Sequence, residues 1–261
     1  MISPFQALVY GLLQGLTEFL PVSSSAHLSL LPWLAGWPDP GLAFDVALHA
    51  GTLAALLAYF RADWARMLRA ALREPRSEEA RRLWVLALAS VPAGLAGLLL
   101  EKQAETVFRT PALVAATLAL FGLLLAWADR FAKDGGNAGD PSPSRALLIG
   151  AAQALAIVPG VSRSGATITA GLFLGLDREA AARFSFLLAT PITAAAALHK
   201  VPKLGAGLLD PGVLLAVAAS ALSGAAAIHF LLRWTRRAGY LPFAAYRILL
   251  AAAIFASACR A

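Results

Sequence analysis

Cysteine is nearly absent from the 261-residue sequence, which contains one, Cys259, close to its end. A single cysteine excludes an intrachain disulfide framework. Charged residues are also scarce, at 14% of the chain, while 59% of the residues are hydrophobic and the mean hydropathy is +0.69. These values lie far outside the range of soluble domains and predict a polytopic membrane protein. No basic segment followed by a small-residue cleavage site opens the chain, so we expect no removable signal peptide.

The positive charge of the chain is concentrated in short segments between apolar runs. The net charge is +7, but the accumulation of Lys and Arg in cytoplasmic loops explains this distribution better than nucleic-acid binding does. We therefore expect the basic segments 61–82 and 233–241 to be cytoplasmic, the bilayer to be a partner of the chain, and nucleic acid not to be one. The arginines concerned are Arg61, Arg66, Arg69, Arg73, Arg76, Arg81, Arg82, Arg233, Arg236 and Arg237.

Two kinds of apolar segment alternate along the chain. A membrane-spanning helix needs about 20 residues. Segments 5–36 and 146–176 are each interrupted near their middle, by Pro and Ser or by Pro-Gly. Each half reaches only about 20 Å at a rise of about 1.5 Å per residue, too little for two full crossings. We therefore predict two re-entrant helical hairpins. Six other segments are predicted as spans, at about 42–60, 83–100, 111–131, 183–200, 212–232 and 242–259.

The two interrupted segments have related sequences. When Gln14 is aligned with Gln153, Val22-Ser23 coincides with Val161-Ser162. Counting loops from the cytoplasmic segments places the two hairpins on opposite sides of the membrane, with both termini outside. We therefore predict an all-α polytopic membrane protein built as an inverted repeat, with six spans and two re-entrant hairpins. Its parts are a first repeat at 1–131, a cytoplasmic linker at 132–145 and a second repeat at 146–261.

The first hairpin contains an acid, three hydroxyls and an imidazole within an apolar run. Such groups at membrane depth usually face a bundle interior or a water-filled cavity. Ser24 and His27 are compatible with a serine nucleophile and its base, and Ser23 and Ser25 supply further hydroxyls for a substrate. The same serines are preferred residues for the N-cap of the second half-helix. The two roles are compatible, because a helix start also favours an anion.

Gln14 and Glu18 are spaced to face the same side of a short helix. Their oxygens suit a hard divalent cation, so we predict that they bind Mg²⁺ or Ca²⁺. The alternative is that Glu18 forms an ion pair with Arg163 and no metal is involved. Asp45 and His49 share one helical face near the outer end of the first span, and we assign them a supporting role.

The second hairpin supplies a guanidinium in the segment Pro159-Gly-Val-Ser-Arg-Ser-Gly165. Arg163 immediately precedes the second half-helix. A guanidinium, hydroxyls and free backbone N–H groups at a helix start form a phosphate cradle. An ion pair of purely structural role with Glu18 is the alternative for Arg163. The predicted substrate-binding residues of this hairpin are Ser162, Arg163, Ser164 and Thr167.

These motifs resemble the undecaprenyl-diphosphate phosphatase family of bacterial inner membranes, of the bacitracin-resistance type. The resemblance implies that Glu18 is the second acid of an acid-x-x-x-acid motif, that Ser24 and His27 are the hydroxyl and imidazole of the site, and that Arg163 binds phosphate. Many relatives have glutamate at the position of Gln14, so this residue can be a ligand or an orienting group but not an obligatory base. The matching segments are Gly15-Leu-Thr-Glu-Phe-Leu-Pro-Val-Ser-Ser24, Leu48-His-Ala-Gly-Thr52, Pro159-Gly-Val-Ser-Arg-Ser-Gly-Ala-Thr167, Phe184-Ser-Phe-Leu-Leu188 and Pro242-Phe-Ala-Ala-Tyr-Arg247.

The activity that the resemblance implies is hydrolysis of undecaprenyl diphosphate to undecaprenyl phosphate and inorganic phosphate. This reaction recycles the lipid carrier of peptidoglycan synthesis and confers bacitracin resistance. The expected location is the bacterial inner membrane, with the active site facing the periplasm. Either Ser24 attacks the terminal phosphorus or it positions a water molecule, with His27 handling the proton in both cases.

Two other classes of protein share some of these features. A lipid-phosphate transporter or flippase is the main alternative, because transporters also use inverted repeats with half-helices at the midplane. Acid-phosphatase-like lipid phosphatases are disfavoured, because Ser162-Arg163 has no histidine a few residues downstream. The sequence leaves the oligomeric state open, a homodimer included.

Overall fold

The computed structural model describes residues 2–132, 138–200 and 209–258, and within these ranges all regular structure is helical. Cys259 and residues 133–137 of the predicted linker lie outside the described residues. The helices are α1 (Pro4–Phe19), α2 (Ser24–Ala35), α3 (Leu42–Tyr59), α4 (Arg61–Arg73), α5 (Glu78–Leu99), α6 (Glu101–Glu105), α7 (Pro111–Phe131), α8 (Pro143–Ala154), α9 (Arg163–Phe173), α10 (Arg178–Lys200), α11 (Pro211–Trp234) and α12 (Leu241–Ala258), with short 3-10 helices η1 (Val107–Arg109) and η2 (Leu155–Ile157).

The described helices include four that are long and apolar enough to cross a membrane, namely α5, α7, α10 and α11. Helices α3 and α12 occupy the other two predicted spans and are apolar but shorter. Large apolar side chains cover the surface of these helices, for example Leu88, Leu99 and Leu222. Since water does not favour so much exposed apolar surface, these side chains suit contact with lipid. The prediction of an all-helical, multi-pass membrane protein is confirmed.

Each predicted hairpin is a pair of short helices separated by a non-helical break. The first pair is α1 and α2, and the second is α8 and α9. Ser23 and Ser162 begin the second helix of their pairs, and their hydroxyls accept hydrogen bonds from Ala26 N and Gly165 N. These two serines have φ values of 76° and 68°, and among the described residues they alone are non-glycine residues with positive φ. The same unfavoured backbone conformation thus occurs at the two positions that the sequence alignment pairs.

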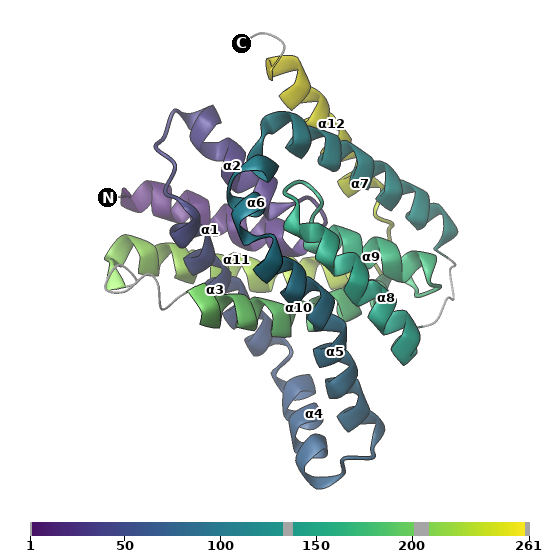
Figure 1. Ribbon diagram of the computed structural model, residues 1–261. Coiled ribbons are helices and arrows are strands. Elements are labelled where there is room, and N and C mark those ends of the chain that lie inside the picture. Colours follow the sequence, from purple (N-terminus) through teal and green to yellow (C-terminus); the bar gives the residue numbers. More distant parts are fainter. Residues whose placement is uncertain (1, 133–137, 201–208, 259–261) are drawn as a thin grey trace.

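The helix pairings also occur twice (Figure 1). Helix α1 packs along α11, and α8 packs along α5; α11 packs against α3, and α5 packs against α10. Gly11 of α1 lies against the Ala216 carbonyl, and Gly150 of α8 lies against the Ala89 carbonyl, so closely that neither position has room for a Cβ atom. Such close helix contacts through small residues are typical of membrane bundles. Matched contacts of this kind are what two equivalent halves would produce.

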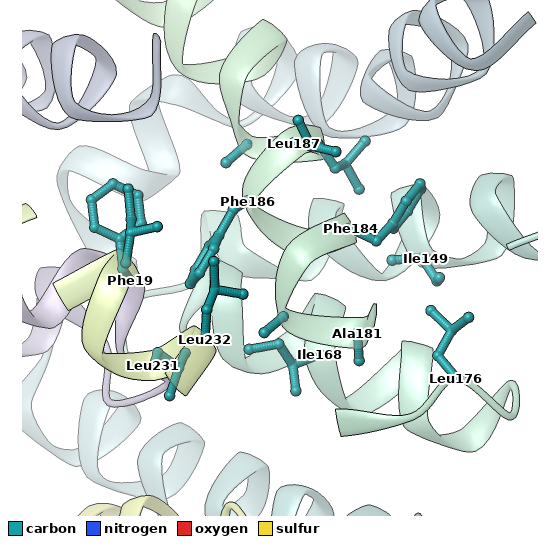
Figure 2. Packing of buried hydrophobic residues seen from close by; sticks show 14 of the residues in the cluster. Phe19, Ile149, Ile168, Leu176, Ala181, Phe184, Phe186, Leu187, Leu231 and Leu232 are labelled. Atoms are coloured by element: carbon teal, nitrogen blue, oxygen red, sulfur yellow. The ribbon is translucent and has the colours of Figure 1, made fainter. Parts of the chain in front are cut away.

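The largest apolar cluster surrounds the first half of α10. Figure 2 shows Phe186 pointing from this helix toward Phe19 and Leu232. The Phe19 and Phe186 rings meet edge to face, with 5.5 Å between their centroids. Phe19 is the last residue of α1, so this packing holds the end of α1 in place, next to Glu18.

Several helices extend further than the sequence predicted. Helix α5 begins at Glu78 rather than near residue 83, and α10 begins at Arg178 rather than near residue 183. Helix α4 forms within the basic segment 61–82, which was predicted as a loop. The reason is that arginine and glutamate are good helix formers, so the helices continue where hydropathy alone ends a span.

Ion pairs connect the predicted cytoplasmic segments 61–82, 132–145 and 233–241 with the nearby ends of α7 and α10. They join 61–82 to the start of α10, 61–82 to the linker, the end of α7 to the start of α10, and 233–241 to the start of α10. These contacts place the joined parts of the chain at one end of the helix bundle. The pairs are Asp63–Arg183 at 2.6 Å, Arg82–Asp140 at 2.7 Å, Asp129–Arg178 at 2.7 Å and Glu179–Arg236 at 2.6 Å.

Candidate functional site

Glu18 lies at the centre of a polar cluster contributed by four helices. Its Oε1 accepts a hydrogen bond from Arg163 Nη2 at 2.8 Å, and its Oε2 accepts one from Ser24 Oγ at 2.5 Å. His49 Nε2 lies 3.6 Å from the same Oε2. The Glu18 side chain is only 6% exposed. The structure therefore brings together Glu18 of α1, Ser24 of α2, His49 of α3 and Arg163 of α9.

Two helix starts converge on this carboxylate. Helix α2 begins at Ser24 and α9 begins at Arg163, so each N-terminus, with its free N–H groups, lies beside Glu18. The Ser164 hydroxyl donates to the carbonyls of Glu18 and Leu20, each 3.2 Å away, which joins the end of α1 to the start of α9. Helix N-termini and a guanidinium favour anions. The cluster thus has more positive than negative groups and can bind a further anion such as phosphate.

Gln14 has an amide oxygen that suits a cation. Gln14 is fully buried, and its Nε2 donates to Glu18 Oε2 at 3.3 Å. Its Oε1 has no hydrogen-bond partner within the described part of the chain. The same part of the chain contains no group of three or more His, Cys, Asp or Glu side chains able to hold a metal ion. Gln14 and Glu18 therefore fit a divalent cation only if a substrate supplies further oxygens, as phosphates do for Mg²⁺.

His27 is engaged with partners other than Ser24. Its Nδ1 lies 2.7 Å from the Ser23 carbonyl oxygen, and its Nε2 lies 2.7 Å from the Tyr246 hydroxyl. The His27 and Tyr246 rings are stacked. The carbonyl can only accept, so Nδ1 carries the proton and Nε2 accepts from Tyr246. In this arrangement Glu18, rather than His27, is the base in contact with the Ser24 hydroxyl.

The other predicted residues have mixed surroundings. The hydroxyls of Ser162 and Ser164 lie 3.2 Å apart, and Thr167 Oγ1 lies 2.7 Å from Ser185 Oγ of α10. Ser162, Ser164 and Thr167 are buried, so their hydroxyls hold the start of α9 in place instead of lining an open cradle. Ser25 is exposed, with its hydroxyl 3.2 Å from Ser23 Oγ.

Asp45 supports His49 through its backbone. The Asp45 carbonyl accepts a hydrogen bond from His49 Nδ1 at 2.7 Å, which directs Nε2 toward Glu18. The contact between these two residues thus runs through the Asp45 backbone carbonyl.

Arg247 of α12 was not assigned to the site from the sequence. It is fully buried, and its Nη2 donates to the carbonyls of Gly160 and Val161, at 2.8 Å each, while Nη1 donates to the Pro21 carbonyl at 3.3 Å. One guanidinium thus bonds the backbone breaks of both hairpins. Its signal in the sequence was a lone charge inside an apolar span, which is a mark of a functional position in membrane proteins.

The fold and this cluster define a multi-pass helical membrane protein with a charged site shared between two interrupted helical hairpins. The chain belongs to the family described as bacitracin resistance protein BacA, which it matches over residues 7–253. It is 53% identical over 251 residues to an undecaprenyl-diphosphatase of Moorella thermoacetica, covering 96% of each chain. It is 50% identical to an undecaprenyl-diphosphatase of Pelotomaculum thermopropionicum, covering 96% of this chain and 95% of the relative. The family inferred from the motifs is confirmed.

Replacement of Arg247 by methionine should destabilise the protein. Three backbone carbonyls in the breaks would lose their donor, and a buried acceptor left without a partner costs about 1–3 kcal/mol. We expect a lower unfolding temperature for Arg247→Met in detergent, and partial recovery in Arg247→Lys, which restores one donor group. The exposed Arg233→Met is the matched control. An unfolding temperature equal to that of the control would show that Arg247 does not hold the breaks together.

Proposed function

We propose that this chain hydrolyses undecaprenyl diphosphate to undecaprenyl phosphate and inorganic phosphate. Relatives bearing the name undecaprenyl-diphosphatase match it over nearly their whole length. The observation that carries the chemistry is the 2.5 Å hydrogen bond between Ser24 and Glu18, beside the guanidinium of Arg163. Ser24, Glu18 and Arg163 thus provide a nucleophile, a base and an anion-binding group within one cluster. The product is the lipid carrier used in peptidoglycan synthesis, and the family name refers to bacitracin resistance.

The reaction begins with binding of the terminal phosphate. Arg163 and the N–H groups at the starts of α2 and α9 bind its oxygens. Phosphate oxygens compete with Glu18 for Arg163, and this leaves the Glu18 carboxylate available to accept the Ser24 proton. His49, held by Asp45, stays beside that carboxylate and keeps it oriented.

The bond-making step follows from this geometry. Ser24 Oγ attacks the terminal phosphorus while its proton moves to Glu18, and the bond to the bridging oxygen breaks to release undecaprenyl phosphate. Water then attacks the phosphoserine, and Glu18 returns the proton to Ser24 Oγ as inorganic phosphate leaves. In the alternative route Ser24 positions a water molecule that attacks the same phosphorus directly. His27 acts in either route by fixing the Ser23 carbonyl and Tyr246 around the start of α2.

We further propose that Mg²⁺ or Ca²⁺ takes part. Gln14 Oε1 and the Glu18 carboxylate would hold it together with substrate oxygens. When bound, such an ion neutralises negative charge on the diphosphate.

The site should face the outside of the bacterial inner membrane. This proposal includes six spans, two re-entrant hairpins and an inverted repeat made of residues 1–131 and 146–261. Three observations support it. Ser23 and Ser162 share a positive φ at aligned positions, the helix contacts are repeated, and ion pairs join the segments 61–82, 132–145 and 233–241 with the nearby ends of α7 and α10. Because the most basic of these segments is 61–82, their side of the membrane is assigned to the cytoplasm.

Removal of the Ser24 hydroxyl tests the covalent route. We expect purified protein with Mg²⁺ or Ca²⁺ to release phosphate from undecaprenyl diphosphate, and Ser24→Ala to lower kcat on the order of a thousandfold, with a similar loss in Glu18→Gln. Acid quenching during turnover should trap phosphoserine in the unaltered protein. Ser144→Ala, at an exposed serine, is the control.

Two results would contradict this scheme in different ways. Full activity in Ser24→Ala would exclude the covalent intermediate. If the unaltered protein releases no phosphate but moves undecaprenyl phosphate across liposomes, the chain is a transporter and not a phosphatase.

A change of Gln14 to glutamate tests the cation site. A second carboxylate would strengthen binding of a divalent cation, so we expect Gln14→Glu to lower the half-saturating concentration of Mg²⁺ or Ca²⁺ on the order of tenfold, the scale on which ligand charge tunes such sites. The measurement is phosphate release against cation concentration. Gln103→Glu, at an exposed glutamine, is the control. An unchanged cation dependence would remove Gln14 from the site.

Cysteine labelling tests the orientation. In a Cys259→Ser background, Arg76→Cys places a thiol in the exposed turn between α4 and α5. We expect a membrane-impermeant maleimide to label this thiol only after intact cells are permeabilised. Labelling of intact cells would invert the topology and move the site to the cytoplasmic face.

A further inference from the structure

Next to the Glu18 cluster lies a mainly apolar cavity of about 590 Å³. It is enclosed by α3, α5, α8 with η2, and α10, and Figure 1 shows α5, α8 and α10 close together in the bundle. Arg163 and His49, which contact Glu18, also line this cavity. The cavity therefore borders the Glu18 cluster through these two side chains.

Gln153 of α8 is a buried polar residue in the cavity wall. Only 2% of its surface is exposed, and both its Nε2 and its Oε1 lack hydrogen-bond partners in the described ranges. Arg163 Nη1, on the wall of the same cavity, is also buried without a partner in these ranges. A buried polar group without a partner costs about 1–3 kcal/mol. A protein can keep such an unpaired buried group where a bound ligand supplies the missing hydrogen bonds.

The two halves of the chain explain why Gln153 is unpaired. Gln14, its counterpart in the first hairpin, donates to Glu18 one turn further along the helix. The residue one turn after Gln153 is Ile157, which lines the cavity. The second hairpin thus keeps the amide but replaces its carboxylate partner by an apolar side chain. The Gln153 amide is therefore available to hydrogen-bond a ligand that combines an anionic group with an apolar chain.

The rest of the wall is small and apolar. Gly94 and Gly97 of α5 and Ile192 and Ala195 of α10 are among the lining residues. A Cβ atom added at Gly97 would meet no atom within 4 Å, so this position opens on free space. Cavities of about 300–1,000 Å³ hold small ligands. This one has room for the first isoprene units of an undecaprenyl chain, with the remaining units in the bilayer.

We propose that Gln153 and this cavity form a subsite for the lipid-linked phosphate and the first isoprene units of the substrate. Gln153 Nε2 and Arg163 Nη1 donate to oxygens of the lipid-linked phosphate, and the gap between α5 and α10 holds the adjoining chain. The terminal phosphate then lies toward Glu18 and Ser24. The subsite rests on the proposed function. It would make the enzyme prefer diphosphates with a long prenyl chain over those with a short chain. Undecaprenyl phosphate, the product, stays in it after the terminal phosphate leaves.

Two variants test the two parts of the subsite by steady-state kinetics. Gly97→Leu fills the cavity without a backbone clash, and we expect it to raise KM for undecaprenyl diphosphate by at least about tenfold. Its kcat/KM for inorganic diphosphate, which has no isoprene unit, should stay unchanged. Ala87→Leu adds the same side chain to an exposed position of α5 outside the cavity and is the control. An equal loss with both substrates, or no loss with the long one, would overturn the placement of the chain.

The second variant, Gln153→Leu, tests the phosphate contact through product inhibition. We expect the inhibition constant of undecaprenyl phosphate to rise roughly tenfold, because one hydrogen bond to an ionised group is lost. The inhibition constant of inorganic phosphate, which binds beside Ser24, should not change. The ligand-free variant should unfold at the same or a higher temperature, since an unpaired amide is replaced by an apolar group of similar size. Parallel changes in both inhibition constants, or none, would remove Gln153 from the subsite.

A binding measurement separates this proposal from the proposed function. Binding of undecaprenyl phosphate to the full chain is measured without turnover, by the ligand-induced shift of the unfolding temperature. If the unaltered protein has no phosphatase activity but Gln153→Leu and Gly97→Leu both weaken this shift, the proposed function fails and the subsite stands. If the protein is active and neither variant changes the shift, the subsite fails and the function stands.

Discussion

The buried ion pair between Glu18 and Arg163, 2.8 Å apart, is the contact on which the site depends. Each residue comes from a different half of the chain, at the end of α1 and at the start of α9. Neither charge could remain buried without the other, because breaking a buried pair by removing one partner costs about 3–5 kcal/mol. The pair therefore holds the two hairpins in register and, by the same contact, brings the Ser24 hydroxyl to a carboxylate. In the proposed mechanism, a phosphate that replaces the carboxylate on Arg163 keeps the guanidinium paired and leaves Glu18 available as the base.

The two backbone breaks impose a second constraint. Within a bilayer, carbonyls outside a helix need donors from the protein itself. Arg247 provides donors to Pro21, Gly160 and Val161, and the Thr117 hydroxyl of α7 donates to the Pro159 carbonyl at 2.7 Å. These donors come from α12 and α7, which pack against each other outside the hairpins. The last helices of the two halves thus supply donors to the carbonyls of the two breaks.

The sequence was informative where one local rule decides the structure. Apolar length and proline positions predicted where the apolar helices lie and where each interrupted segment breaks, and the N-cap role weighed for the serines of the first hairpin is taken by Ser23. It was less informative where a contact joins distant residues. His27 was matched with Ser24 because they are close in the chain, but its ring nitrogens contact Ser23 and Tyr246, the latter from α12. The partnership of Ser24 with Glu18 crosses a break whose geometry depends on the positive φ of Ser23, which no residue pattern specifies.

The two halves share a backbone plan but differ in the side chains at a few aligned positions, and this difference is the basis for a directional site. At the positions of Glu18, Ser24 and His27 the second half has Ile157, Arg163 and Ala166. In the proposed mechanism the first half therefore supplies the base and the nucleophile, and the second half supplies the guanidinium of Arg163 and an apolar wall. A symmetric pair of hairpins would bind a symmetric ligand. This pair suits a molecule with a phosphate to be removed at one end and a hydrocarbon chain at the other, because Arg163 contacts Glu18 and also lines the apolar cavity.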